Sequence, residues 1–81
     1  MLAALQAGNK VVGAKQTRRA LDHGTAATVF LASDADPRIT EPLAQLAQET
    51  GVPVTRVDTM KALGEACSIT VGAAVAALLK P

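Results

Sequence analysis

The apolar run "TVFLAS", residues 28–33, constrains the fold more than any other stretch of this sequence. A short, β-rich run without polar alternation is typical of a strand buried on both faces of a sheet. The segment "DADP" follows, in which Asp36 is suited to cap a helix and Pro37 to occupy its first turn. Apolar residues then recur at helical spacing from 39 to 47, and Gly51 ends this predicted helix.

The same alternation of strand and helix extends along the rest of the chain. The pattern predicts strands at 10–13 and 52–57, and helices from Ala14 to His23, ended by Gly24, and from Met60 to Ala66. A further short helix is expected at residues 2–7. Strands that alternate with helices predict a layered α/β domain with right-handed crossover connections.

The last segment, "ITVGAAVAALLK" at residues 69–80, leaves two structures open. Alanine has the highest helix propensity, so propensity alone slightly favours a helix. The segment has no polar stripe, however, and its small residues also suit a crowded central strand.

Composition excludes several classes of protein. A length of 81 residues predicts one domain, and a hydrophobic content of 49% argues against disorder. Phe30 is the only aromatic residue, so a surface of several stacked aromatic rings is excluded. A single cysteine, Cys67, rules out an internal disulfide and fits a reducing, cytoplasmic setting with a buried thiol. The chain start lacks signal-peptide features and the apolar tail is too short to span a bilayer, so we expect a soluble intracellular protein. We also expect it to be a monomer.

Positive charge is concentrated early in the chain. The formal net charge is only +1, yet four of the eight Lys and Arg residues lie between residues 10 and 19, and no acid precedes Asp22. This segment opens the helix predicted to begin after Gly13. Because the free N–H groups and the positive dipole end of a helix N-terminus favour an anion, the cluster indicates an anionic partner.

A helical wheel at ~100° per residue divides this segment into two faces. The inward face consists of Thr17, Ala20 and Leu21, and the outward face of Lys15, Gln16 and Arg19, with Arg18 on its flank. Lysine and arginine can donate to guanine O6 and N7, and glutamine can both donate and accept on a base edge. Arg18 and Lys10 are suited to hold phosphates. The spacing leaves two interpretations open, a solvated amphipathic helix and a nucleic-acid contact.

Residues suited to a metal or a catalytic site are few. Asp36 fits the helix cap better than a metal pair with Asp34, which we interpret as a loop carboxylate that orients nearby basic residues. His23 is the only histidine and has no Cys or His at ligand spacing, so no zinc site is predicted. The sequence also lacks a glycine-rich nucleotide motif and a nucleophile elbow. We therefore expect no enzyme, no metal and no cofactor.

Four stretches in order, "GAKQTRRAL", "ASDADP", "MKALGEAC" and "ITVGAAVA", resemble the L-seven-Ae and L-thirty-e superfamily of ribosomal proteins, which bind kink-turn RNA. The resemblance runs from about Lys10 to Leu79 and points to the small bacterial YbxF-like branch. It implies a three-layer α/β/α sandwich with a four-stranded mixed sheet. In that fold the alanine-rich tail is the fourth strand.

The resemblance also implies a set of RNA-binding residues. The archaeal motif Gly-x-Asn-Glu-x-x-Lys opens a helix that enters the widened major groove of kinked RNA and reads tandem sheared G·A pairs. Here Gly13 matches the glycine, and Lys15 and Gln16 stand at the Asn-Glu positions. Arg19 stands at the lysine position and would contact bases, while Arg18 would hold the RNA backbone.

A second family element is the loop before the last strand, usually Gly-Ile-Glu-Val. Here it reads "SITV", residues 68–71, with Ser68 in place of the glycine and Thr70 in place of the acid. The resemblance implies that Ile69, Thr70 and Val71 cover a flipped-out nucleotide of the RNA bulge. Lys61 flanks this loop and is either a phosphate contact or a solvated lysine.

The sequence thus predicts a non-catalytic, cytoplasmic domain that recognises kink-turn RNA. Two alternatives stay open. One is a ribosome-associated protein that binds another bent RNA, and the other is a protein-interaction module that uses the same surface.

Overall fold

The computed structural model describes residues 9–81, which form three helices and one four-stranded sheet. In chain order the elements are β1 (Lys10–Val12), α2 (Ala14–Asp22), β2 (Ala26–Ala32), α3 (Pro37–Glu49), β3 (Val54–Val57), α4 (Met60–Ala66) and β4 (Val75–Leu79). The predicted alternation is confirmed, and most boundaries shift by no more than two residues. The helix expected at residues 2–7 lies outside the described residues.

The sheet is mixed and has the strand order β1-β4-β2-β3. Strand β4 pairs antiparallel with both β1 and β2, and β2 pairs parallel with β3. The alanine-rich tail is therefore a strand, and the helix that propensity alone favours is wrong. Because β4 has a neighbour on each side and helices over both faces, Ala76 and Ala77 are both fully buried. This burial explains why the segment has no polar stripe.

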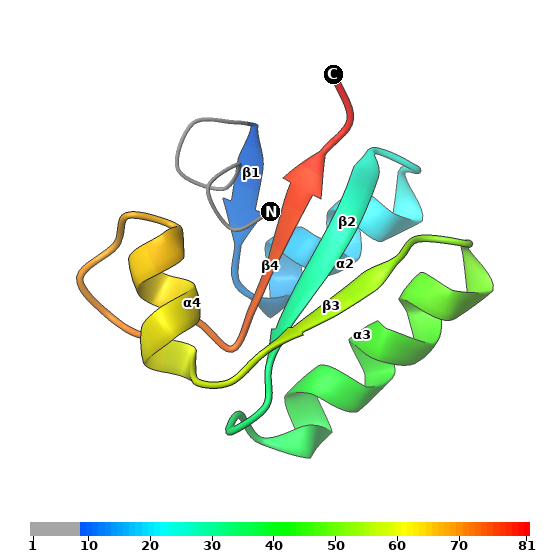
Figure 1. Ribbon diagram of the computed structural model, residues 1–81. Helices are drawn as coiled ribbons and strands as arrows, with labels where there is room; N and C mark the ends of the chain where they lie inside the picture. The colour runs from blue at the N-terminus through cyan, green and yellow to red at the C-terminus, as the bar shows by residue number, and fades with distance from the viewer. Residues whose placement is uncertain (1–8) are drawn as a thin grey trace.

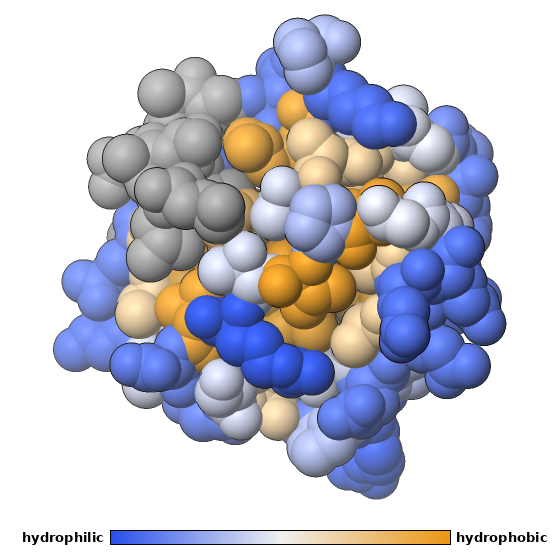
Figure 2. Space-filling model, turned by 45° about the vertical axis from the view of Figure 1, so that its right-hand side comes forward, coloured by the Kyte–Doolittle hydropathy of each residue, from blue (hydrophilic) through white to orange (hydrophobic). Residues whose placement is uncertain are grey.

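Helices α2 and α3 cover one face of the sheet and α4 covers the other (Figure 1). Neighbouring residues of β2 point to opposite layers. Phe30 belongs to the core beneath α4 and packs with Leu63, whereas Leu31 belongs to the core beneath α2 and α3. Strand β2 is thus buried on both faces, as its unbroken apolar run predicts. On the face shown in Figure 2, apolar side chains gather near the centre and hydrophilic ones form most of the outline.

One end of the sheet gathers the starts of all three helices. Because β1 and β2 run antiparallel to β4 and β3 runs parallel to β2, strands β1, β2 and β3 all end there, at the bottom of Figure 1. Each strand is followed within a few residues by its helix, and the chain returns there before β4. We call this region, residues 13, 33–36, 58–59 and 72–74, the loop end, and residues 67–71 lead back to it along α4.

The three described helices finish in the same hydrogen-bonded turn, in which two backbone N–H groups reach back to carbonyls of the last helical turn. Gly24 after α2 and Gly51 after α3 take the left-handed conformation, with φ of 70° and 74°. Both glycines confirm the predicted helix ends. After α4 the equivalent residue is Ser68, with φ of 62°. Ser68 is the one non-glycine residue with positive φ in the described chain.

Candidate nucleic-acid interface

Helix α2 presents the outward face that the helical wheel predicts. Thr17, Ala20 and Leu21 are buried against the sheet and α3. The side chains of Lys15, Gln16 and Arg19 are exposed. Within residues 9–81 neither Lys15 nor Arg19 lies within ion-pair distance of an acid. The outward face therefore offers two charges and an amide to a partner.

The N-terminus of α2 differs from those of the other helices at the loop end. Asp36 caps α3, since its carboxylate accepts the Arg38 N–H at 2.9 Å. Thr59 caps α4, since its hydroxyl oxygen accepts the Ala62 N–H at 3.0 Å. No side chain caps α2, whose N-cap residue is Gly13. Its first-turn N–H groups therefore have no capping side chain, and they point in the direction that favours an anion.

Asp34 also serves a helix start. Its Oδ1 accepts the Met60 N–H at 2.7 Å, so it ties the turn after β2 to the first turn of α4. The expectation that Asp34 orients basic residues is therefore wrong. Within residues 9–81 no lysine or arginine lies at ion-pair distance from Asp34.

The backbone conformation at position 13 requires a glycine. Its φ of 102° and ψ of 157° lie in a region that is essentially restricted to glycine. A Cβ built on it meets nothing within 4 Å, so no neighbour in the described chain demands its small size. Its N–H donates to the Val75 carbonyl at 2.9 Å. This bond joins the start of α2 to the start of β4 and places the helix beside the loop that precedes β4.

The loop residues predicted to contact RNA divide into two groups. Ile69 is half-buried and packs against the core beneath α4. Thr70 and Val71 are exposed, and the exposed fraction of Val71 is 68%. Val71 is therefore the apolar side chain that the loop projects, and Ile69 mainly anchors the loop.

Three large apolar side chains are exposed within residues 9–81, and all three lie at or next to the loop end. Besides Val71 they are Ile39, in the first turn of α3, and Met60, the first residue of α4, which are 41% and 37% exposed. Neither was predicted as a contact residue, because Ile39 continues the apolar period of its helix and Met60 only begins the next helix. Their position in a first helical turn is the signal that distinguishes them from core residues. Apolar side chains that gather at one end indicate a contact surface.

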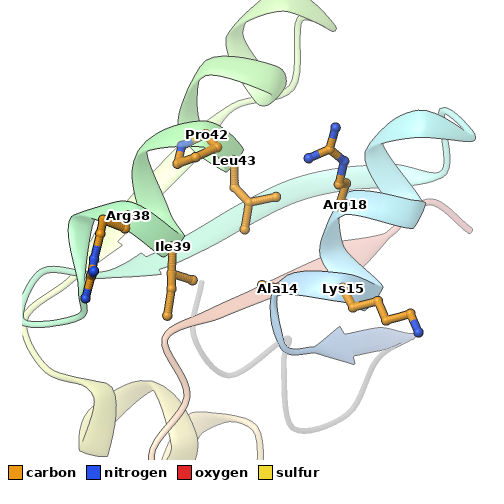
Figure 3. A pocket seen from close by; sticks show the side chains of 7 residues that line it. All are labelled: Ala14, Lys15, Arg18, Arg38, Ile39, Pro42 and Leu43. Carbon is orange, nitrogen blue, oxygen red and sulfur yellow. The ribbon is translucent and has the colours of Figure 1, made fainter.

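A groove of about 320 Å³ lies between α2 and α3 (Figure 3). It is lined by Ala14, Lys15, Arg18, Arg38, Ile39, Pro42 and Leu43. Leu43 and Arg18 extend towards it from opposite helices, and no acidic side chain lines it. Arg38 is bound to the Asp36 carboxylate at 2.8 Å, and Arg18 lies 3.9 Å from Asp22. The two arginines are thus partly balanced, and the groove is apolar with a basic rim.

Two side chains have perturbed ionisation. The Arg38 guanidinium, and then the Arg38 backbone N–H, hold the pKa of Asp36 below its ordinary value. Burial raises the pKa of the Cys67 thiol, although Lys10 acts in the opposite direction. A buried thiol that keeps its proton is a poor nucleophile. Cys67 is therefore a core residue, as the sequence predicts.

Within the described chain, no three His, Cys, Asp or Glu side chains are grouped closely enough to hold a metal ion. None of the helices between residues 9 and 81 has the length and apolar character needed to cross a membrane.

Comparison with known proteins identifies the fold. The sequence model of the ribosomal protein L7Ae/L30e/S12e/Gadd45 family matches residues 1–81. The chain belongs to this family. An RNA-binding protein of Geobacillus sp. (strain WCH70) is 55% identical over 76 residues, which cover 94% of this chain and 93% of that protein. The RNA-binding protein YbxF of Geobacillus stearothermophilus is 55% identical over 76 residues with the same coverage.

Solved structures share the architecture. The Giardia lamblia 15.5kD RNA binding protein superposes with a TM-score of 0.92 at 30% identity, covering 99% of this chain and 71% of that one. A Bacillus halodurans protein, 23% identical, shares the fold with a TM-score of 0.87 over 98% of this chain and 83% of that one. The three-layer α/β/α sandwich with a mixed four-stranded sheet, implied by the resemblance, is confirmed.

Proposed function

We propose that this protein is a non-catalytic RNA-binding domain that recognises kink-turn RNA through its loop end and stabilises the kinked form. Its family and the RNA-binding relatives named above support the choice of RNA. The finer assignment rests on the N-terminus of α2, which lacks a side-chain cap and carries exposed Lys15, Gln16 and Arg19 on one face.

The outward face of α2 has the donors that a base edge requires. The planar guanidinium of Arg19 can donate two hydrogen bonds to guanine O6 and N7, and the Lys15 ammonium can donate to the same atoms. Gln16 can pair with an edge that offers both a donor and an acceptor. The major groove of A-form RNA is too narrow and deep for side chains to read, so this face requires RNA whose groove is opened by a kink.

The loop before β4 supplies the apolar part of the surface. Val71 is largely exposed on the loop over α4, four residues before Val75, whose carbonyl accepts the Gly13 N–H at the start of α2. A base that leaves the helical stack can rest on such a side chain without an aromatic ring. The flanking residues Ile69 and Thr70 shape the remaining contact, and Arg18 holds a phosphate from the side.

Stabilisation of the kink follows from differential binding. A flexible RNA samples extended and kinked forms, and the protein shifts this equilibrium by as much as its affinity for the two forms differs. We expect the contacts on α2 and the loop to form together when the two RNA stems bend towards each other. No catalytic group is needed for this effect.

The test compares two RNA duplexes at one ionic strength. One carries the kink-turn with its tandem G·A pairs, and in the other these pairs are changed to Watson–Crick pairs. We expect strong preference for the first, and losses of about 1–3 kcal/mol for Arg19→Ala and Lys15→Ala. Lys80→Ala, at the opposite end of the molecule, serves as the matched control. Equal, weak binding to both duplexes would contradict the proposal and leave the protein-interaction alternative.

A further inference from the structure

The loop that projects Val71 lies directly on the backbone of α4. A Cβ built on Gly64, in the middle of α4, would lie 2.2 Å from the Val71 carbonyl oxygen and 3.1 Å from the Gly72 Cα. Side-chain carbon atoms do not approach a carbonyl oxygen so closely. The loop therefore occupies the space that any other residue at position 64 would fill.

Hydrogen bonds fasten the loop on both sides of this contact. The Ile69 N–H donates to the Gly64 carbonyl at 3.1 Å, and the Ala73 N–H donates to the Met60 carbonyl at 3.0 Å. Gly72 lies over Met60, where a Cβ would come within 3.1 Å of the Met60 Cβ. Two glycines, one on the helix and one on the loop, thus permit a backbone-to-backbone contact.

Helix α4 is the more firmly held partner in this contact. Its residues Leu63 and Cys67 are almost fully buried in the core, and Asp34 and Thr59 bind its first turn. The loop residues Ser68, Thr70 and Val71 are exposed. A side chain at position 64 would therefore move the loop and leave the helix in place. To reach a contact distance of 3.0 Å the carbonyl has to retreat by at least about 0.8 Å.

We propose that Gly64 is a positioning residue for RNA recognition. Because it has no side chain, the 68–72 loop lies directly on the backbone of α4, and this contact fixes where the loop meets the RNA bulge. This inference rests on the proposed function and deepens it. Gly64 is buried beneath the loop, so its role is to position the residues that would contact RNA. It acts by keeping Val71 within reach of a base that α2 does not contact.

The decisive variant is Gly64→Ala, because it adds one methyl group and no charge. Alanine is the better helix former and Gly64 has no left-handed φ, so α4 itself is not weakened. Gly72→Ala is the graded companion, since its methyl group meets mainly the Met60 side chain and backbone at 3.1–3.4 Å and needs a smaller shift. Glu65→Ala, at the next position on α4, is the matched control because its side chain is exposed and does not lie under the loop.

Each protein is titrated with three kink-turn RNAs at one ionic strength, and dissociation constants are measured by fluorescence anisotropy. The first RNA is intact, the second has an abasic residue in place of the flipped-out bulge nucleotide, and the third has Watson–Crick pairs in place of the G·A pairs. Removal of the base should weaken wild-type binding about five- to tenfold, the effect of uncovering one apolar side chain of this size.

Gly64→Ala should bind intact RNA about five- to tenfold more weakly than wild type and lose less than about twofold further on the abasic RNA. Its preference for G·A pairs should be unchanged, because α2 is untouched. The dependence of Gly72→Ala on the bulge base should lie between those of wild type and Gly64→Ala. Glu65→Ala should show the wild-type dependence. A merely destabilised protein would lose affinity for all three RNAs by the same factor.

Two outcomes overturn the inference. If the Gly64→Ala variant keeps the full wild-type dependence on the bulge base, the position of the loop on α4 does not matter for RNA binding. A uniform loss on all three RNAs would assign Gly64 to stability alone. If the Gly64→Ala variant does not fold, Gly72→Ala tests the inference by the same comparison, the ratio of its dissociation constants for abasic and intact RNA. Failure of the proposed function is separate, because it would appear in wild-type protein as an absence of preference for G·A pairs.

Discussion

Ser68→Gly tests how much backbone strain the loop between α4 and β4 carries. Ser68 stands where α2 and α3 have Gly24 and Gly51, in the same hydrogen-bonded turn and at nearly the same positive φ. A residue with a Cβ pays about 1–2 kcal/mol in this conformation. Glycine avoids that cost but loses about 0.5–1 kcal/mol more chain entropy on folding. The net expectation is a stabilisation of about 0.5–1 kcal/mol.

The measurement is urea unfolding of both proteins, with thermal unfolding as a second probe. Ser68→Gly should raise the urea midpoint without changing the slope and raise the melting temperature by about 2–8 °C. Ser33→Gly, at the chain's other serine, is the matched control because Ser33 has no positive φ. That variant should lose about 0.5–1 kcal/mol, since it adds chain entropy without relieving strain. Two shifts of the same sign would refute the strain argument.

Three further predictions concern the start of α2 and the cap of α3. Thr17→Val should stabilise the protein by about 1 kcal/mol in urea unfolding, because the fully buried Thr17 hydroxyl has no hydrogen-bond partner within the described chain; a loss would disprove this reading of the hydroxyl. Gly13→Ala should cost about 1–3 kcal/mol from backbone strain alone, since its Cβ meets no neighbour, and unchanged stability would show that the turn adapts. The pKa of Asp36 is lower in the folded protein than in the unfolded chain. The stability that its carboxylate contributes is therefore present above the unfolded pKa and is lost as the pH falls through the folded pKa. In Arg38→Gln the Asp36 carboxyl should therefore titrate at higher pH by NMR, and an unchanged midpoint would contradict the pairing.

Local patterns predicted most of the fold because their physical causes are local. The period of α2 separates Thr17, Ala20 and Leu21 from the charged face, and burial follows that division. The unbroken apolar run of β2 predicted a strand covered on both faces. Gly24 and Gly51 marked helix ends because only glycine adopts their φ without strain.

Tertiary context decided what local patterns left open. The tail around Ala76 has helical propensity but becomes β4, because it lies between two strands and beneath helices on both sides. Only the family resemblance predicted that strand. The exposure of Ile39 is indicated only by its place in a first helical turn, and the role proposed for Gly64 has no sequence signal of its own. Both depend on which segments the fold brings together, and a glycine that admits a neighbouring backbone looks like any other glycine in the sequence.

Several expectations stay predictions. The RNA-binding roles proposed for residues on α2 and in the loop before β4 await the binding experiments described above. The monomeric state, the single-domain organisation and the cytoplasmic setting likewise await measurement.

The direction of β4 has a practical consequence for such measurements. The strand begins beside the N-terminus of α2 and carries the chain five residues away from it, a distance of roughly 17 Å at the rise of an antiparallel strand. The C-terminus accordingly emerges at the far end of the molecule, at the top of Figure 1. A fluorophore, an affinity tag or a surface tether attached there leaves the loop end free. Immobilised protein can then be titrated with RNA without the attachment competing for the surface.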